Sequence, residues 1–263
     1  MKKLVILIAV AMAAPTAIAG AKGQIYFGQN YTDTIEAGVD IQVDNNVRFG
    51  IEKDDNDSRF RVEGYVGYKF NDHLTMDLNY RESDEMDTSL DDRRVRLEST
   101  VSKLGTPEWL LRDIRIRADY YADADERDND FRGELRFRNR VRFGDLQWNL
   151  VSEITDINHD AREGSNSWDD GKSRTQFLVA NELHYKVGEA TVSYIYQPRY
   201  TLRGEGGFNR IRHTFEVQQR FDNEWRLRAG IRKVSTRDIH RGDAQGKDWN
   251  DDFVWRLGAD YRF

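Results

Sequence analysis

Charged and apolar residues alternate along residues 131 to 143 of the chain. The alternate positions of this segment hold Arg132, Glu134, Arg136, Arg138, Arg140 and Arg142. Because successive side chains of a β-strand point to opposite faces, this spacing predicts a strand with one strongly basic face. Guanidinium groups attract anions and bind carboxylates and phosphates through paired hydrogen bonds. The segment is therefore a candidate surface for attracting anionic solutes.

The same alternation assigns other arginines to the polar face of their own predicted strands. These residues are Arg59, Arg61, Arg94, Arg96, Arg115, Arg117, Arg210, Arg212, Arg226, Arg228, Arg232, Arg256 and Arg262. Acidic residues share that face, namely Glu63, Asp77, Glu98, Asp119, Glu153, Glu182, Glu216 and Asp260. Two interpretations stay open. The charges can pair across neighbouring strands and form a rigid polar wall. Alternatively, the excess of arginine can favour anionic or sugar-acid solutes, as basic rings do in channels.

Apolar residues spaced two apart recur along the chain and predict about fourteen strands. The predicted strands are 24–31, 35–43, 47–51, 60–70, 74–80, 95–101, 114–120, 131–143, 146–154, 177–187, 192–200, 211–221, 225–231 and 253–263. An even number of such strands is typical of an all-β, transmembrane, antiparallel up-and-down β-barrel. Twelve strands are the alternative, because Val39 to Ile51 can also be read as one strand carrying Asn45 and Asn46.

Short turns and longer polar segments alternate between the predicted strands. The short turns fall at 44–46, 71–72, 144, 188 and 222–223, with a longer one at 103–108. The longer polar segments are 53–57, 82–92, 122–130, 158–173, 203–208 and 238–251. Outer-membrane barrels have short periplasmic turns and longer external loops, so both chain ends are expected on the periplasmic side. The segments 158–173 and 238–251 are the candidates for partly occluding a lumen.

The two ends of the chain both indicate export. Lys2 and Lys3 precede an apolar run that ends in the small-residue pattern Ala17-Ile18-Ala19, which predicts a cleaved signal peptide over residues 1–19. Residues 20–263 then form a single barrel domain. The final stretch FVWRLGADYRF has large aromatics at both ends of its apolar face, as an interfacial girdle requires. It resembles the terminal strand that bacterial outer-membrane proteins present to their assembly machinery, which implies recognition through the strand ending at Phe263.

The overall composition is polar and acidic. Mean hydropathy is -0.79, charged residues make up 33% of the chain, and the formal net charge is -6. A barrel accommodates this composition, because only every second strand residue faces lipid. The acidic balance argues against a nucleic-acid partner. The chain has no cysteine, which excludes disulfides and lipidation at an N-terminal cysteine.

Catalytic and metal-binding patterns are not apparent in the sequence. The histidines are His73, His159, His184, His213 and His240. Of these, only His184 is predicted on the polar face of a strand, opposite Thr191 and Ser193, and no His-x-Ser-Asn run of the outer-membrane phospholipases accompanies it. Acidic runs such as Asp54 to Asp57 lack the glycine and terminal glutamate of a calcium loop. We therefore expect no enzymatic activity, no cofactor and no defined metal site.

The last third of the chain resembles the outer membrane porin G family. The resemblance rests on Phe208-Asn209-Arg210 at a strand start, Phe221-Asp222-Asn223 at a turn, and the closing segment 249–263. It implies a monomeric fourteen-stranded channel that passes small hydrophilic solutes, chiefly mono- and oligosaccharides, through the outer membrane of a Gram-negative bacterium. The expected partners are outer-membrane lipids, lipopolysaccharide, the assembly machinery and those solutes.

Two further possibilities qualify this resemblance. The porin family specific for oligogalacturonates or sialic acids, with twelve strands and an arginine-lined pore, is a second relative. The pH gating of the porin G family is not expected, because the segment 203–208 is short and no histidine lies beside Phe208-Asn209-Arg210. A structural or adhesive barrel with a plugged lumen is the alternative from a different functional class.

Overall fold

The computed structural model describes residues 22–29, 35–56, 59–85, 92–123, 130–158, 174–203, 208–221, 224–238 and 250–263. These residues form β1 (Lys22–Gln29), β2 (Ile35–Gln42), β3 (Val47–Asn56), β4 (Arg59–Lys69), β5 (Leu74–Glu85), β6 (Asp92–Ser102), β7 (Asp113–Asp123), β8 (Asp130–Phe143), β9 (Leu146–Asn158), β10 (Arg174–Val187), β11 (Ala190–Arg203), β12 (Phe208–Phe221), β13 (Trp225–Asp238) and β14 (Asn250–Arg262). No segment among them is a helix long and apolar enough to cross a bilayer. The predicted signal peptide and most of the segments 158–173 and 238–251 lie outside the described residues.

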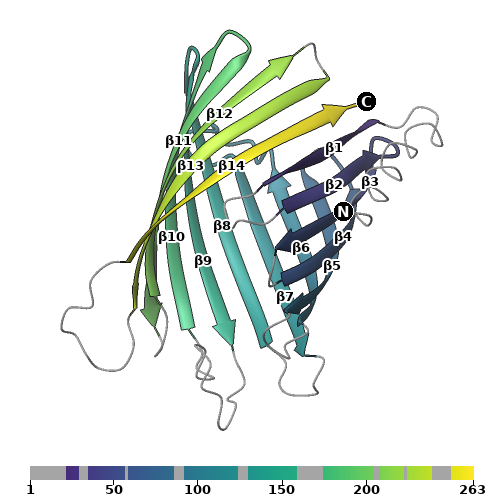
Figure 1. Cartoon of the computed structure of the whole chain (residues 1–263), viewed down its shortest axis with the longest axis vertical. Coiled ribbons are helices and arrows are strands. Elements are labelled where there is room, and N and C mark those ends of the chain that lie inside the picture. The colour runs from purple at the N-terminus through teal and green to yellow at the C-terminus, as the bar shows by residue number, and fades with distance from the viewer. Residues whose placement is uncertain are drawn as a thin grey trace.

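The strands form one closed antiparallel barrel in chain order (Figure 1). Each strand pairs with its neighbours in sequence, and β1 pairs with β14 to close the sheet, with Tyr26 opposite Asp260 at this seam. Closure removes the two free edges that an open sheet would expose. The prediction of a fourteen-stranded antiparallel barrel is therefore confirmed.

The twelve-strand alternative is wrong because a tight turn separates β2 from β3. The Asp44 carboxylate accepts hydrogen bonds from the backbone N–H groups of Asn46, at 2.6 Å, and Val47, at 2.7 Å. These two bonds lower the pKa of Asp44 below its ordinary value. The carboxylate therefore supports the turn above the normal carboxyl range and loses that effect as pH falls through the lowered pKa.

Several strands extend further than the apolar alternation predicted. β3 continues to Asn56, β5 to Glu85 and β13 to Asp238, while β14 already begins at Asn250. Their polar composition predicts loops at these positions. Near a barrel rim both faces of a strand can be hydrated, so the backbone ladder continues without an apolar face to mark it.

Large apolar side chains cover the outer face of the barrel. The exposed residues include Phe27, Val66, Leu78, Val95, Leu97, Ile116, Leu135, Ile154, Leu183, Phe215, Ile231 and Leu257. Leu257, for example, is 58% exposed. A continuous exposed apolar surface of this extent would favour aggregation in water, whereas hydrocarbon solvates it. The outer face is therefore suited to lipid.

Two rows of aromatic and polar residues bound this apolar surface on β12 to β14. At the turn end, Trp225 lies across from Tyr261, with ring centroids 5.0 Å apart. At the loop end, Lys233 lies across from His213 and Phe253. The segment from Trp225 to Lys233 spans roughly 20 Å along the membrane normal for a strand tilted by about 40°. This height is close to the apolar band of roughly 25 Å in outer-membrane barrels.

We predict that Leu257→Arg destabilises the barrel in bilayers, because it places a charge near the middle of the apolar band. A cost of about 2 to 4 kcal/mol is expected for a mid-membrane position. Urea unfolding of the protein in phospholipid vesicles, followed by its heat-modifiable electrophoretic mobility, measures the change. Val254→Arg is the matched control on the opposite face of the same strand. Equal loss of stability in both variants would contradict the assignment of faces.

Candidate functional site

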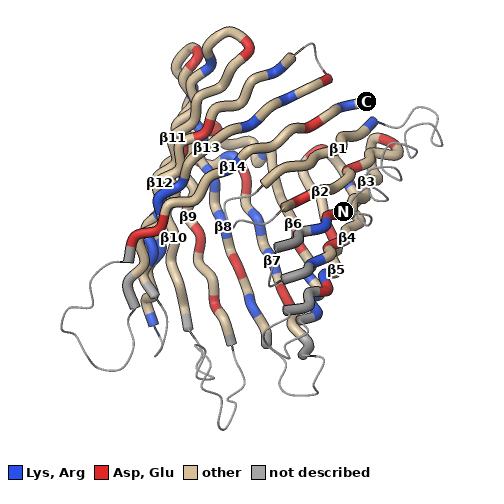
Figure 2. The backbone as a smooth tube through the Cα atoms, in the orientation of Figure 1, with Lys and Arg blue, Asp and Glu red and all other residues tan. Residues whose placement is uncertain are grey.

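The inner wall of the barrel is the candidate functional site. Side chains opposite the exposed apolar residues face inward, and the cross-strand register assigns the predicted arginines to this face. They are Arg61, Arg94, Arg96, Arg115, Arg117, Arg132, Arg136, Arg138, Arg140, Arg142, Arg210, Arg212, Arg226, Arg228, Arg232 and Arg256, together with Glu134. Arg59 is in β4, and its side chain lies outside the described residues. Figure 2 shows positive and negative positions distributed along the strands of this wall.

Long inner side chains lie along the wall and reach across an intervening strand. The first example is Tyr26 of β1, whose hydroxyl donates a hydrogen bond of 2.6 Å to Glu52 on β3. Gly38 of β2 lies between them in the register. A Cβ atom at Gly38 would overlap the Tyr26 ring, so only glycine leaves room for the ring to lie flat.

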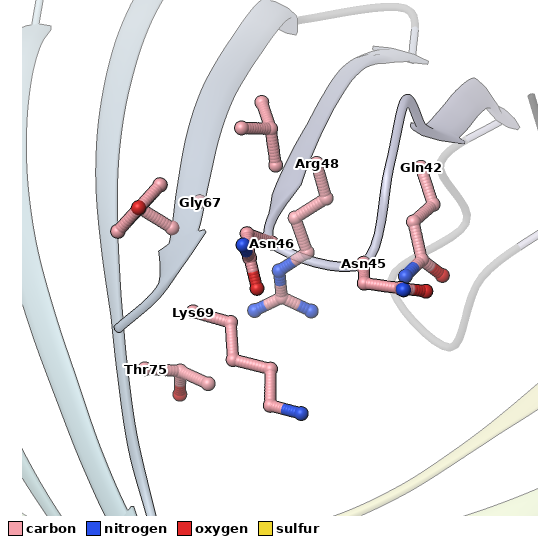
Figure 3. Close-up of a pocket in the computed structure, with 9 residues that line it drawn as sticks. Gln42, Asn45, Asn46, Arg48, Gly67, Lys69 and Thr75 are labelled. Atoms are coloured by element: carbon pink, nitrogen blue, oxygen red, sulfur yellow. The ribbon is translucent and has the colours of Figure 1, made fainter. Parts of the chain in front are cut away.

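The same arrangement occurs twice more on β2 to β5. Tyr65 of β4 crosses Gly50 and donates a hydrogen bond to Asp40 of β2. Arg48 of β3 crosses Gly67 of β4 and contacts both Asp77 oxygens on β5, at 2.8 and 2.7 Å. Figure 3 shows Arg48 beside Gly67 at the turn end of the wall, where a small pocket is also lined by Lys69 and Asn46. Each row consists of a long side chain, a glycine and a carboxylate.

Two buried carboxylates connect the arginines of β6 to β8. Asp119, which is 0% exposed, accepts a hydrogen bond of 2.7 Å from Arg96 and lies 3.4 Å from Arg117. Glu134, which is 4% exposed, lies 3.1 Å from Arg117 and also contacts Arg115 and Arg132. A buried carboxylate needs several donors to offset its loss of hydration. These arginines are therefore held on the wall by shared acids.

A second set of ion pairs lies on the strands at and beside the seam between β1 and β14. Arg226 and Arg228 both contact Asp260, and the Arg226 distance is 2.5 Å. Arg256 of β14 reaches past β1 to Glu36 of β2 at 2.7 Å. Glycines make the seam close-fitting, because a Cβ atom on Gly28 would lie 2.5 Å from the Cα atom of Gly258. Closure thus uses side-chain contacts as well as the backbone ladder.

Arginines gather on β11 to β13 toward the loop end of the barrel. We call Arg199, Arg210, Arg212 and Arg232 the basic cluster. Arg199 lies directly across from Arg210, and Arg212 is the diagonal neighbour of Arg199 on β11 and of Arg232 on β13. Arg210 and Arg212 are two residues apart on β12 and therefore lie on the same face. The inner acid of β12, Glu216, lies 3.7 Å from Arg256 of β14. Arg199 also lies 3.4 Å from Glu153 of β9. With four arginines beside these two acids, this part of the wall has an excess of positive charge.

His184 lies across from Ser193, as the sequence predicts, and also contacts Glu182. Its Nδ1 atom lies 2.8 Å from the Ser193 hydroxyl, and its Nε2 atom lies 3.7 Å from Glu182. Asn149 donates a hydrogen bond of 3.0 Å to Glu182. The order resembles a nucleophile, a base and an acid, but Ser193 is only 3% exposed. A hydrolytic serine must be reachable and must face oxyanion donors. The contacts observed here instead fix the imidazole on the wall.

Several inner residues were missed by sequence reasoning. Tyr26 and Tyr65 interrupt the polar pattern of the inner face, and Arg48, Arg81 and Arg199 were not assigned to it. Their positions follow the same two-residue spacing, so strict counting from the neighbouring apolar residues would have found them. Among the described residues, no group of three or more potential metal ligands lies together.

Comparisons with known proteins find similar folds but no matching family model and no matching curated sequence. No protein-family model matches the chain, and no curated protein sequence matches it. The solved structure of a bacterial polysaccharide outer membrane secretin is 9% identical, with a TM-score of 0.59 over 92% of this chain and 97% of that one. OmpT of Vibrio cholerae (12%, TM-score 0.48, 92% and 97% coverage) and a KdgM porin in complex with oligogalacturonate (12%, 0.46, 92% and 99%) also align.

The fold and the surface together define a class of protein. A closed fourteen-stranded antiparallel barrel with an apolar exterior and a charged interior has the architecture of outer-membrane β-barrels. At 9% identity, the match to the secretin supports this fold alone. The porin G resemblance is supported at the level of the barrel fold. These comparisons do not show that the chain belongs to that family.

We predict that Gly50→Ala displaces Tyr65 from the wall, because the new methyl group would overlap the tyrosine ring. The loss of packing and of the Tyr65 contact with Asp40 should cost about 1 to 3 kcal/mol. Gly64→Ala is the control, since a Cβ atom there would approach nothing closer than 3.8 Å. Unchanged urea stability in Gly50→Ala would contradict the row arrangement.

Proposed function

We propose that this protein is an outer-membrane porin that passes small hydrophilic solutes by passive diffusion through a water-filled lumen. The solutes are mono- and oligosaccharides, with a preference for anionic ones. The observation that carries the proposal is the arrangement of the inner side chains, which lie flat against the wall. Tyr26 and Arg256, for instance, are each held by a carboxylate two strands away.

Flat side chains favour an open path. A 14-stranded barrel encloses more space than an 8-stranded one, whose interior side chains can fill it. Arginines pointing to the axis could still narrow the lumen. Contacts such as Arg96 to Asp119, at 2.7 Å, hold the guanidinium groups at the wall instead. The charged groups then contact a solute from the side without obstructing its passage.

The basic cluster supports the preference for anions. Arg212 has Arg199 and Arg232 as diagonal neighbours on the two adjacent strands, so a passing carboxylate would encounter an excess of positive charge there. Within a channel, such a region raises the local concentration of anions and lowers that of cations. Sugar acids combine a carboxylate with hydroxyl groups that the polar wall can hydrogen-bond. They are therefore the favoured class of solute.

The proposal includes an orientation and a set of partners. The short turns are periplasmic and the longer connections external, which leaves both chain ends in the periplasm. Outer-membrane lipids and lipopolysaccharide surround the apolar face, and the loop-end row containing His213 and Lys233 lies at headgroup level. The strand ending at Phe263 is the element that the assembly machinery recognises. A single barrel encloses a complete lumen, which supports a monomer.

Passive diffusion needs neither covalent chemistry nor a cofactor. The set of Ser193, His184 and Glu182 contributes polar surface and rigidity to β10 and β11. Its buried hydroxyl supports this role over hydrolysis. The proposed function is therefore that of a channel and not of an enzyme.

Liposome swelling with sugars of graded size tests the central proposal. Proteoliposomes should swell in monosaccharides, and the rate should fall with oligosaccharide length. Absence of swelling for every sugar, with correctly folded protein, would instead support the adhesive barrel with a plugged lumen.

We predict that Arg210→Gln/Arg212→Gln weakens anion selectivity. At a distance of about 10 Å in water, one unit charge stabilises an anion by roughly 0.4 kcal/mol, so two charges change its permeability about fourfold. Reversal potentials across planar bilayers in a KCl gradient at low ionic strength measure this ratio. The double lysine variant of the same positions retains the charge and should remain anion-selective. A cation-selective native channel would overturn the anionic preference while leaving diffusion of neutral sugars intact.

We also predict that Ser193→Ala leaves sugar permeation unchanged, since the variant removes one hydroxyl from a buried contact with His184. Swelling rates of the variant and the native protein provide the measurement. Hydrolysis of a chromogenic ester by the native protein, abolished in Ser193→Ala, would contradict the channel assignment for this set of residues.

A further inference from the structure

Near the turn end, β8 is paired with β9 on one side but has no strand beside it on the side of β7. β7 begins at Asp113, which pairs with Arg138, whereas β8 continues to Phe143. The last residues of β8 therefore have no partner in β7. The unpaired backbone groups of such an edge need another source of hydrogen bonds.

The segment from Lys103 to Arg112 supplies these hydrogen bonds. The Arg112 N–H group donates to the Arg138 carbonyl at 2.8 Å, and the Arg140 N–H group donates to the Glu108 carbonyl at 2.7 Å. Within the segment, the N–H groups of Leu110 and Leu111 both donate to the Pro107 carbonyl, at 2.9 and 3.1 Å. The segment is thus a compact turn docked on β8.

The two sides of this turn contact opposite faces of the wall. The Glu108 carboxylate lies 3.9 Å from Arg140, an inner residue. Asn139, an outer residue, donates from its side-chain amide to the carbonyl oxygens of Trp109, at 3.3 Å, and of Leu110. These bonds hold Trp109 and Leu110 on the outer side of the barrel.

Trp109 and Leu110 have large apolar side chains that are exposed near the turn end of the barrel. Trp109 is 63% exposed and Leu110 is 53% exposed. Asn139 is two residues from Val141, which pairs with the outward Trp148 of β9. The turn therefore extends the exposed apolar face beyond Asp113, the residue at which β7 begins. This continuity with the lipid-facing surface identifies what covers the two side chains.

We propose that residues 103–112 form a membrane-interface anchor, in which Trp109 and Leu110 insert among the phospholipid headgroups at the turn end of the barrel. Tryptophan favours this region because its ring is apolar and its N–H group can still hydrogen-bond. The assignment to the periplasmic leaflet rests on the orientation given under the proposed function. Because β7 begins only at Asp113, it has no interfacial side chains at the turn end, and the anchor provides them.

A single introduced thiol tests the anchor, because the native chain contains no cysteine. Leu110→Cys, labelled with an environment-sensitive fluorophore in phosphatidylcholine vesicles, should emit at shorter wavelength than the same label at Asp145→Cys in a neighbouring exposed turn. Leu257→Cys provides the reference for the hydrocarbon region. Lipids brominated near the headgroup should quench the Leu110 label at least twofold more than lipids brominated near the chain end.

Two outcomes would overturn the anchor. One is a Leu110 label that matches Asp145 in emission and in quenching by aqueous iodide. The other is stronger quenching by the deep bromines, as expected at Leu257. Heat-modifiable mobility selects the folded barrels, and Trp109→Cys repeats the measurement should Leu110→Cys fail to fold. Vesicle swelling is read in parallel, so a barrel that anchors but admits no solute would remove the proposed channel and retain the anchor.

Discussion

Side chains that reach a partner two strands away are the interaction on which the interior of this barrel depends. Neighbouring strands lie roughly 4.8 Å apart, so such a contact covers nearly 10 Å of wall. Tyrosine and arginine are long enough for this distance, and a glycine on the strand between them leaves the necessary space. Tyr26 over Gly38 to Glu52 is the simplest instance. The lateral bonds neutralise the acids and keep the long side chains away from the axis.

The wall is not uniform around its circumference. On β1 to β5 the long side chains are matched row by row with carboxylates, as Arg48 is with Asp77. On β11 to β13, arginines lie beside other arginines, and Arg199 faces Arg210 directly. A solute in the lumen would therefore meet a balanced surface on one side and a basic surface on the other. Such an arrangement favours the approach of an anion from one direction.

The fold followed from the sequence because membrane strands alternate strictly between lipid and water. Leu257 and its apolar neighbours on β14 are spaced by two residues, and the turn at Asp44 separates β2 from β3. Strand ends were less predictable, since polar residues such as Asp54 to Asn56 continue a ladder that their composition does not reveal. The contacts of the inner wall were also beyond the sequence. Whether Tyr65 meets Asp40 depends on the register of three strands and on the shape of Gly50.

The seam has a consequence for the order in which the molecule assembles. Arg256 and Glu36 are separated by 220 positions in the sequence, and nearly every strand lies between them. Hairpins join strands adjacent in the sequence, whereas this contact requires the two ends of the sheet to meet. Because closing so long a loop is entropically costly, it becomes favourable only once the intervening hairpins are in place. We therefore expect the Arg256 to Glu36 pair to form last during folding. By the same reasoning, the pairing of β1 with β14 is where the sheet would separate first during unfolding.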